Sequence, residues 1–139
     1  MATTFVFFID RSLGSQGVAQ ALRNAGACVE VHDDHFAVNE QDAVWLAEVA
    51  LRNWIILTKD EKIAFRNGEQ SAIARTDARV FVFSAGNTSG HTTAEAFQEA
   101  LVRMNRFAQG NPAPFIAKVY KSGKVRAWKS RTQLLKLLK

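Results

Sequence analysis

Three aspartates occupy positions from which they could act together on a metal ion. Asp10 and Asp60 each follow a run of apolar and β-branched residues, and Asp42 falls in the first turn of a predicted helix. Carboxylates that converge repel one another unless a cation or a proton intervenes. Their oxygens are hard ligands suited to Mg²⁺ or Mn²⁺. Such a metal can activate water and stabilise the leaving oxygen of a phosphodiester, so the pattern indicates hydrolysis of a nucleic acid.

Each of these acids also has a local explanation. Asp42 lies three residues after Asn39, a predicted N-cap, and a carboxylate favours the N-terminus of a helix. Asp60 could cap the helix that follows it, and Asp10 could close a turn through its own backbone. The hypothesis therefore depends on the joint placement of the three side chains, which local capping does not require.

Further acids surround these positions. Asp33 and Asp34 end a predicted strand and Glu40 is a near neighbour of Asp42, so all three are additional candidates for the metal site. The segment His32-Asp33-Asp34-His35 mixes imidazole with carboxylate, which would suit Zn²⁺ or Mn²⁺. Adjacent residues at a strand end point in different directions, so we interpret this segment as ordinary polar residues.

The elements that must position these side chains alternate along the chain. Strands are predicted at residues 5–9, 28–31, 54–58 and 80–83. Helices are predicted at residues 14–26, 40–52, 61–76 and 92–108, the last capped by Thr92 or Thr93. This order predicts an α/β fold with a mainly parallel sheet and helices on both faces. Ligands of such sheets bind beyond the carboxyl ends of the strands, where Asp10, Asp42 and Asp60 would meet.

The remainder of the chain is predicted to be a C-terminal β-hairpin and a basic tail. Residues 115–120 and 125–128 form the hairpin across Ser122-Gly123, and a short basic helix covers residues 131–138. We expect one domain over residues 1–139, with a core at 5–108 and residues 114–139 as an appendage. The chain has 139 residues, 47% of them hydrophobic, near the commonest size of one domain.

Composition bounds the setting of the protein. Cys28 is the one cysteine, so no intramolecular disulfide can form. The sequence shows no signal peptide, and no apolar run approaches the length of a membrane span. We therefore expect a soluble cytoplasmic protein without a membrane partner.

Charge is distributed unevenly along the chain. Residues 1–102 carry 8 Lys and Arg against 13 Asp and Glu, whereas residues 103–139 carry 10 Lys and Arg and no acid. The C-terminal bases, among them Lys121, Lys124 and Arg126, are interleaved with Tyr120 and Trp128, which suits phosphate contact and base stacking in RNA. The alternative is that the aromatic residues pack the hairpin onto the body.

Three segments together resemble the PIN-like domain of VapC-type toxins. They are Phe8-Ile9-Asp10-Arg11-Ser12-Leu13-Gly14, His32-Asp33-Asp34-His35-Phe36 and Trp54-Ile55-Ile56-Leu57-Thr58-Lys59-Asp60-Glu61-Lys62-Ile63. The similarity continues through Arg79–Phe83 and Gly86-Asn87 to Pro114–Ala117. The resemblance implies a three-layer Rossmann-like fold, a Mg²⁺-dependent ribonuclease and pairing with an antitoxin, which could use the basic surface. It also carries the acids of the family over to Asp10, Asp42 and Asp60.

The sequence departs from the family at one position. Many members have a further acid two residues after the last aspartate, where this chain has Lys62. A single metal, or one completed by RNA, is therefore the safer expectation. Arg11, Lys59 and Lys62 are candidates for holding phosphate; the alternative for the first two is ion pairing with Asp10 and Asp60.

Three classes of function remain. The first is a metal-dependent endoribonuclease, the toxin of a toxin–antitoxin pair, acting on RNA; a homodimer is left open. The second is a noncatalytic PIN-like module that binds RNA or protein, which Lys62 permits. The third, a phosphoacceptor signalling domain, lacks the adjacent acidic pair expected after the first strand.

Overall fold

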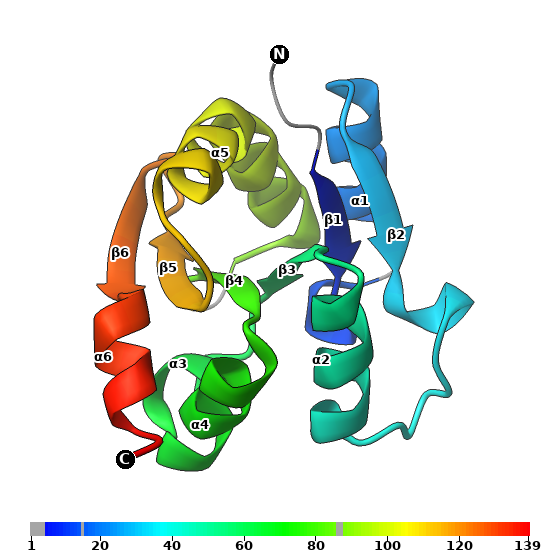
Figure 1. The fold of residues 1–139 in the computed structure, drawn as a ribbon. Coiled ribbons are helices and arrows are strands. Elements are labelled where there is room, and N and C mark those ends of the chain that lie inside the picture. The colour runs from blue at the N-terminus through cyan, green and yellow to red at the C-terminus, as the bar shows by residue number, and fades with distance from the viewer. Residues whose placement is uncertain (1–4, 15, 86–87) are drawn as a thin grey trace.

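One mixed sheet organises the chain in the computed structural model, which describes residues 5–14, 16–85 and 88–139 (Figure 1). The six strands lie in the order β2-β1-β3-β4-β5-β6. Neighbours from β2 to β5 are parallel, and β6 is antiparallel to β5. Gly86 and Asn87, which contribute to the family resemblance, lie outside the described residues, as does Ser15 of the first predicted helix.

Most of the strands coincide with apolar runs of the sequence. They are β1 (Val6–Ile9), β2 (Cys28–Val31), β3 (Ile55–Thr58), β4 (Arg79–Phe83), β5 (Phe115–Val119) and β6 (Val125–Lys129). All four residues of the central strand β3 are buried. A parallel strand covered on both faces needs apolar side chains at every position, which explains its continuous hydrophobic run.

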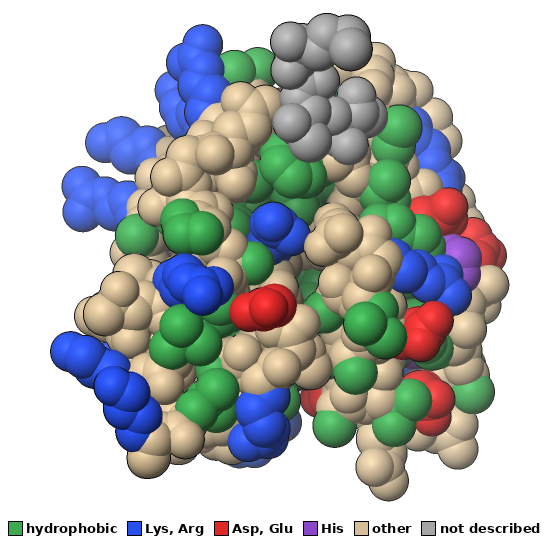
Figure 2. Space-filling model, viewed as in Figure 1, with side chains coloured by type: hydrophobic (Ala, Val, Ile, Leu, Met, Phe, Trp, Pro, Cys, Tyr) green, Lys and Arg blue, Asp and Glu red, His purple; other side chains and the backbone are tan. Residues whose placement is uncertain are grey.

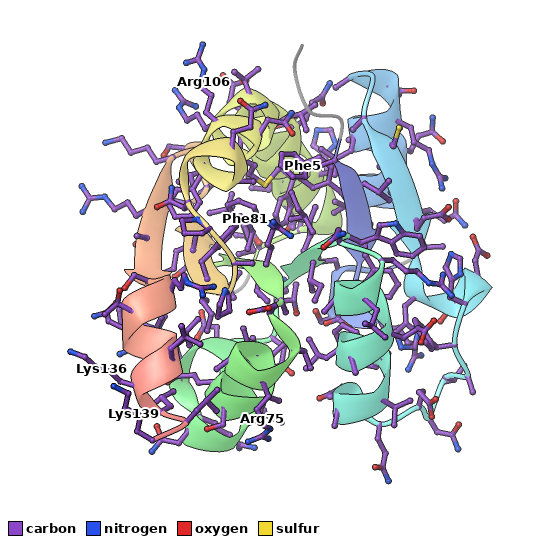
Figure 3. All side chains as sticks on the ribbon, in the orientation of Figure 1. Phe5, Arg75, Phe81, Arg106, Lys136 and Lys139 are labelled. Atoms are coloured by element: carbon purple, nitrogen blue, oxygen red, sulfur yellow. The ribbon has the colours of Figure 1, made fainter. Side chains whose placement is uncertain are left out.

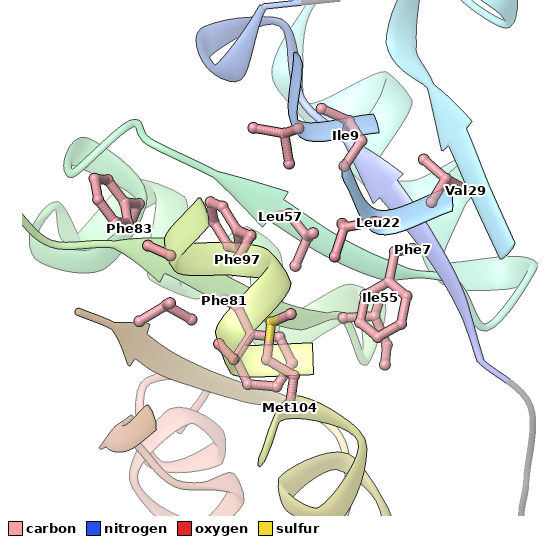
Figure 4. Close-up of a cluster of buried hydrophobic side chains, with 14 of the residues drawn as sticks. Phe7, Ile9, Leu22, Val29, Ile55, Leu57, Phe81, Phe83, Phe97 and Met104 are labelled. Carbon is pink, nitrogen blue, oxygen red and sulfur yellow. The ribbon is translucent and has the colours of Figure 1, made fainter. Parts of the chain in front are cut away.

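Helices cover both faces of this sheet. They are α1 (Gly17–Asn24), α2 (Asp42–Leu51), α3 (Lys62–Phe65), α4 (Asn67–Thr76), α5 (Gly90–Gly110) and α6 (Arg131–Lys136), with short 3₁₀ turns η1 (Arg11–Leu13) and η2 (His32–Asp34). One core cluster lies under α1 and α5, where Leu22, Phe97 and Met104 meet the strands (Figure 4). A second cluster lies on the opposite face, where α2, α4 and α6 contribute Trp45, Ile73 and Leu134. The α/β architecture in three layers is thus confirmed.

Several helix boundaries differ from the sequence-based prediction. The helix predicted at 61–76 is divided into α3 and α4 because Arg66 has an extended backbone, with ψ of 132°. The N-cap of α2 is Gln41, not Asn39, and that of α5 is Ser89, whose hydroxyl accepts a hydrogen bond from the Thr92 amide at 3.1 Å. A serine hydroxyl directly before the first turn can satisfy an unpaired amide there.

The first strand of the C-terminal hairpin, which was expected to belong to an appendage, is a buried strand of the central sheet. β5 pairs with β4 along its whole length, and four of its five residues are buried. Leu134 of α6 is fully buried, so the core extends well beyond residue 108. The long helix α5 acts as the crossover that returns the chain to a parallel position beside β4. None of the helices within the described residues is long and apolar enough to cross a membrane.

Candidate functional site

Asp10 stands directly after β1 and is held by two hydroxyl groups. Its Oδ2 accepts hydrogen bonds from Ser12 Oγ and from Thr58 Oγ1, both at 2.7 Å. Thr58 is the last residue of β3 and is fully buried, while Asp10 is 9% exposed. Two charge-assisted bonds on one oxygen fix the orientation of the carboxylate. The other oxygen, Oδ1, has no hydrogen-bond partner among the described residues.

The same hydroxyl groups connect Asp10 to Asp60. The Asp60 amide donates to Thr58 Oγ1 at 3.0 Å, and the Lys59 amide donates to Ser12 Oγ at 2.9 Å. The segments after the adjacent central strands β1 and β3 are therefore joined by one network. We call Asp10, Ser12, Thr58 and Asp60 the rim network. Asp60 also shows the local bond expected of a cap, because its Oδ1 accepts from the Lys62 amide at 3.0 Å.

Asp42 lies at the same end of the sheet but outside the rim network. It begins α2 and is exposed, and its Oδ1 accepts a hydrogen bond from Trp45 Nε1 at 3.0 Å. The Trp45 ring is buried against Phe8, with ring centroids 5.5 Å apart. Asp42 is thus anchored to the core through its own helix. This resembles the local role, at the N-terminus of a helix, that the sequence left open for it.

The fit of a metal ion can be judged from these contacts. Nowhere in residues 5–14, 16–85 and 88–139 do three or more His, Cys, Asp or Glu side chains form a group able to hold a metal. The sharing of one ion by Asp10, Asp42 and Asp60 therefore stays a prediction. A looser mode fits the donors present: Mg²⁺ commonly binds one or two carboxylates and completes its shell with water and substrate phosphates. Asp10 and Asp60 are the candidates for such a pair.

Of the additional acids, Asp33 lines a separate pocket. A pocket of about 180 Å³ is lined by Ile9, Arg11, Gly14, Val31, His32 and Asp33. Arg11 pairs with Asp33 at 3.3 Å and donates to the Val38 carbonyl at 2.8 Å. Arg11 thus ties the segment after β2 to β1 and does not pair with Asp10 as the ion-pairing alternative supposed. Asp34 is exposed and Glu40 half-buried, without a link to the rim network among the described contacts.

The candidate phosphate-binding residues form two groups. Lys59 and Lys62 line a shallow opening of about 320 Å³ together with Asp60, Glu61 and Phe83. Lys124 and Arg126 line a second opening with Tyr120 and Ser122, and Lys121 is exposed in the same turn. On the face shown in Figure 2, most Lys and Arg side chains lie over α5, β6 and α6, whereas most Asp and Glu side chains lie near β2 and the segment after it. The predicted charge asymmetry is therefore a spatial one.

Sequence reasoning missed the residues that orient the acids. Ser12 and Thr58 hold Asp10, and Trp45 holds Asp42. A signal existed in the spacing, since Ser12 follows Asp10 by two residues and Thr58 precedes Asp60 by two. His32 was interpreted as a polar strand-end residue, but it is 3% exposed and packs between Phe36 and Trp45, with centroids at 5.5 and 5.8 Å.

Comparisons with known proteins identify the family of the chain. A family model described as "PIN like domain" matches residues 5–85, which include Asp10, Asp42 and Asp60. A Mycobacterium tuberculosis (strain H37Rv) protein named "Putative ribonuclease VapC45" is 32% identical over 123 residues, covering 86% of this chain and 88% of the relative. No solved structure matched the chain. The matched residues and the three-layer sheet together show that the chain belongs to the PIN-like domain family.

Proposed function

We propose that this chain is a metal-dependent endoribonuclease that hydrolyses RNA phosphodiester bonds as the toxin of a toxin–antitoxin pair. The observation that carries the proposal is the rim network. It holds the Asp10 carboxylate and the Asp60 backbone amide just beyond the adjacent strands β1 and β3, at the end of the sheet where ligands bind. The similarity to a protein named as a ribonuclease supports the substrate class.

In this proposal the side chains of the chain have distinct tasks. Asp10, held by Ser12 and Thr58, and Asp60, held through its own amide, would ligate Mg²⁺ or Mn²⁺, with Asp42 as a further ligand. The ion would supply charge stabilisation at the scissile phosphate and a more acidic water. Lys59 and Lys62, which line the opening beside Asp60, would hold the neighbouring phosphates of the RNA.

The test is cleavage of a fluorogenic single-stranded RNA by the purified chain with and without Mg²⁺. Asp10→Asn and Asp60→Asn should each lower the rate at least about 100-fold, because a neutral amide is a much weaker ligand for a hard cation. Asp77→Asn is the matched control, since Asp77 is exposed, precedes β4 at the opposite end of the sheet and has φ of 58°, which asparagine tolerates. Its rate should equal that of the native chain.

The same assay separates the alternative function. A noncatalytic RNA-binding module would bind the RNA but cleave at the same background rate in the native chain and in Asp10→Asn. The toxin role needs a cellular measurement: induced expression of the native chain should arrest growth, and Asp10→Asn should not. The antitoxin would then be the co-expressed protein that restores growth and copurifies with the chain.

A further inference from the structure

The sheet places a lysine in the same row as the rim network. Thr58 of β3 is in register with Val82 of β4, and Val82 is in register with Lys118 of β5. Register partners on parallel strands point to the same face, so Lys118 lies on the face of Thr58 and Asp10, two strand spacings or about 10 Å from Thr58. The register therefore brings a lysine from the basic C-terminal region to the carboxyl end of the sheet, where Asp10 and Asp60 lie.

The Lys118 ammonium is held between two aromatic rings. Its Nζ lies 3.8 Å from the ring centroid of Trp128 and 5.0 Å from that of Phe65, and the two rings meet edge to face at 5.4 Å. Lys118 is half-buried, and no ion pair between described residues neutralises it. A partly desolvated ammonium without a carboxylate is a good partner for an anion.

Phe65 lies near the rim network along the chain. It is the last residue of α3, which begins two residues after Asp60, so five residues limit its distance from Asp60 to about 17 Å. Its side chain is 51% exposed, an unusual position for a large aromatic residue. An exposed ring beside a positive charge offers a face on which a nucleic acid base can stack.

We propose that Phe65, Lys118 and Trp128 form a holding platform for single-stranded RNA, in which an unstacked base lies on Phe65 and the adjoining phosphate meets Lys118. This inference rests on the proposed ribonuclease function and names how its substrate is held. Residues 103–139 carry no Asp or Glu, so this region favours a polyanion such as RNA as its partner over a protein surface of mixed charge. Lys129, whose Nζ lies 5.6 Å from the Trp128 ring, adds a second positive charge beside that ring.

The experiment measures binding of a fluorescein-labelled single-stranded RNA oligomer by anisotropy, over a range of salt concentrations. All variants are made in the full chain carrying Asp10→Asn, so that the RNA stays intact. Phe65→Ala should weaken binding roughly 5- to 100-fold with an unchanged salt dependence, because stacking is lost and no charge is removed. Phe65→Tyr should bind like the parent. Lys118→Met, which keeps the stem over the rings, should lower the slope of log K against log salt by about 0.7.

Lys136→Met is the charge-matched control. Lys136 is exposed on α6, and Figure 3 shows it projecting away from the body of the molecule. Its substitution should leave both affinity and salt slope unchanged. Thermal melting of each variant verifies the fold, and the half-exposed position of Phe65 makes unfolding by Phe65→Ala unexpected.

Two results would overturn the platform, and they differ in what else they reject. If the native chain cleaves RNA and Phe65→Ala and Lys118→Met bind it as the parent does, the platform is rejected and the ribonuclease stands. If the native chain does not cleave RNA and the Asp10→Asn parent does not bind it, both proposals fail together.

Discussion

Replacing Thr58 by valine tests whether the rim network, and not the mere presence of acids, positions Asp10. Valine keeps the branched shape of threonine but lacks the hydroxyl. The change therefore removes the 2.7 Å bond to Asp10 Oδ2 and the acceptor for the Asp60 amide at 3.0 Å. Because Thr58 is fully buried, water cannot replace the lost hydroxyl.

The size of the effect follows from these contacts. A hydrogen bond to a charged group contributes about 1.5–3 kcal/mol and a neutral one about 1 kcal/mol. Burial of a methyl group in place of the hydroxyl offsets about 1 kcal/mol. The free energy of unfolding should thus fall by about 2 kcal/mol, which lowers Tm by about 6 °C for a chain of this size. Because Asp10 keeps only one of its two hydrogen-bond donors, the RNA cleavage rate of Thr58→Val should fall by about 10- to 100-fold.

Thr58→Ser is the matched comparison, because it keeps the hydroxyl and removes a buried methyl. It should be destabilised by about 1 kcal/mol yet cleave RNA within a few-fold of the native rate. Urea unfolding followed by circular dichroism gives the stability of both variants, and cleavage of the fluorogenic RNA in Mg²⁺ gives the rate. A Thr58→Val chain that is folded and as active as Thr58→Ser would refute the view that this hydroxyl positions Asp10.

Two further changes probe the surroundings of the rim. Trp45→Phe keeps a buried aromatic ring but removes the donor to Asp42, so the free energy of unfolding in urea should fall by about 1–2 kcal/mol. If Asp42 is a metal ligand, the Mg²⁺ dependence of the cleavage rate should also shift. An unchanged Mg²⁺ titration would argue against that role. Lys62→Ala keeps the backbone hydrogen bond from residue 62 to Asp60 and removes one exposed charge. RNA affinity should fall a few-fold, and the slope of log K against log salt should be lower by about 0.7. Unchanged affinity and cleavage would exclude a substrate contact by Lys62.

The sequence by itself determined the strands and the layers. The apolar runs before Asp10 and Asp60 and the helical spacing between them are local patterns, and alternation of these elements leaves few topologies open. The rule that parallel strands collect their carboxyl ends at one edge then placed both aspartates together before any coordinates were known. The basic C-terminal region was equally visible, because charge can be counted along the chain.

Only the tertiary structure decided how these groups contact one another. Pairing across 46 to 48 positions joins Ser12 and Asp10 to Thr58, and no periodicity within one segment encodes such a bond. The return of β5 to a place beside β4 depends on the packing of α5, and it turned an expected appendage into part of the core. The same strand register brought Lys118 to the acidic edge, because side-chain positions across a sheet are set by long-range hydrogen bonding.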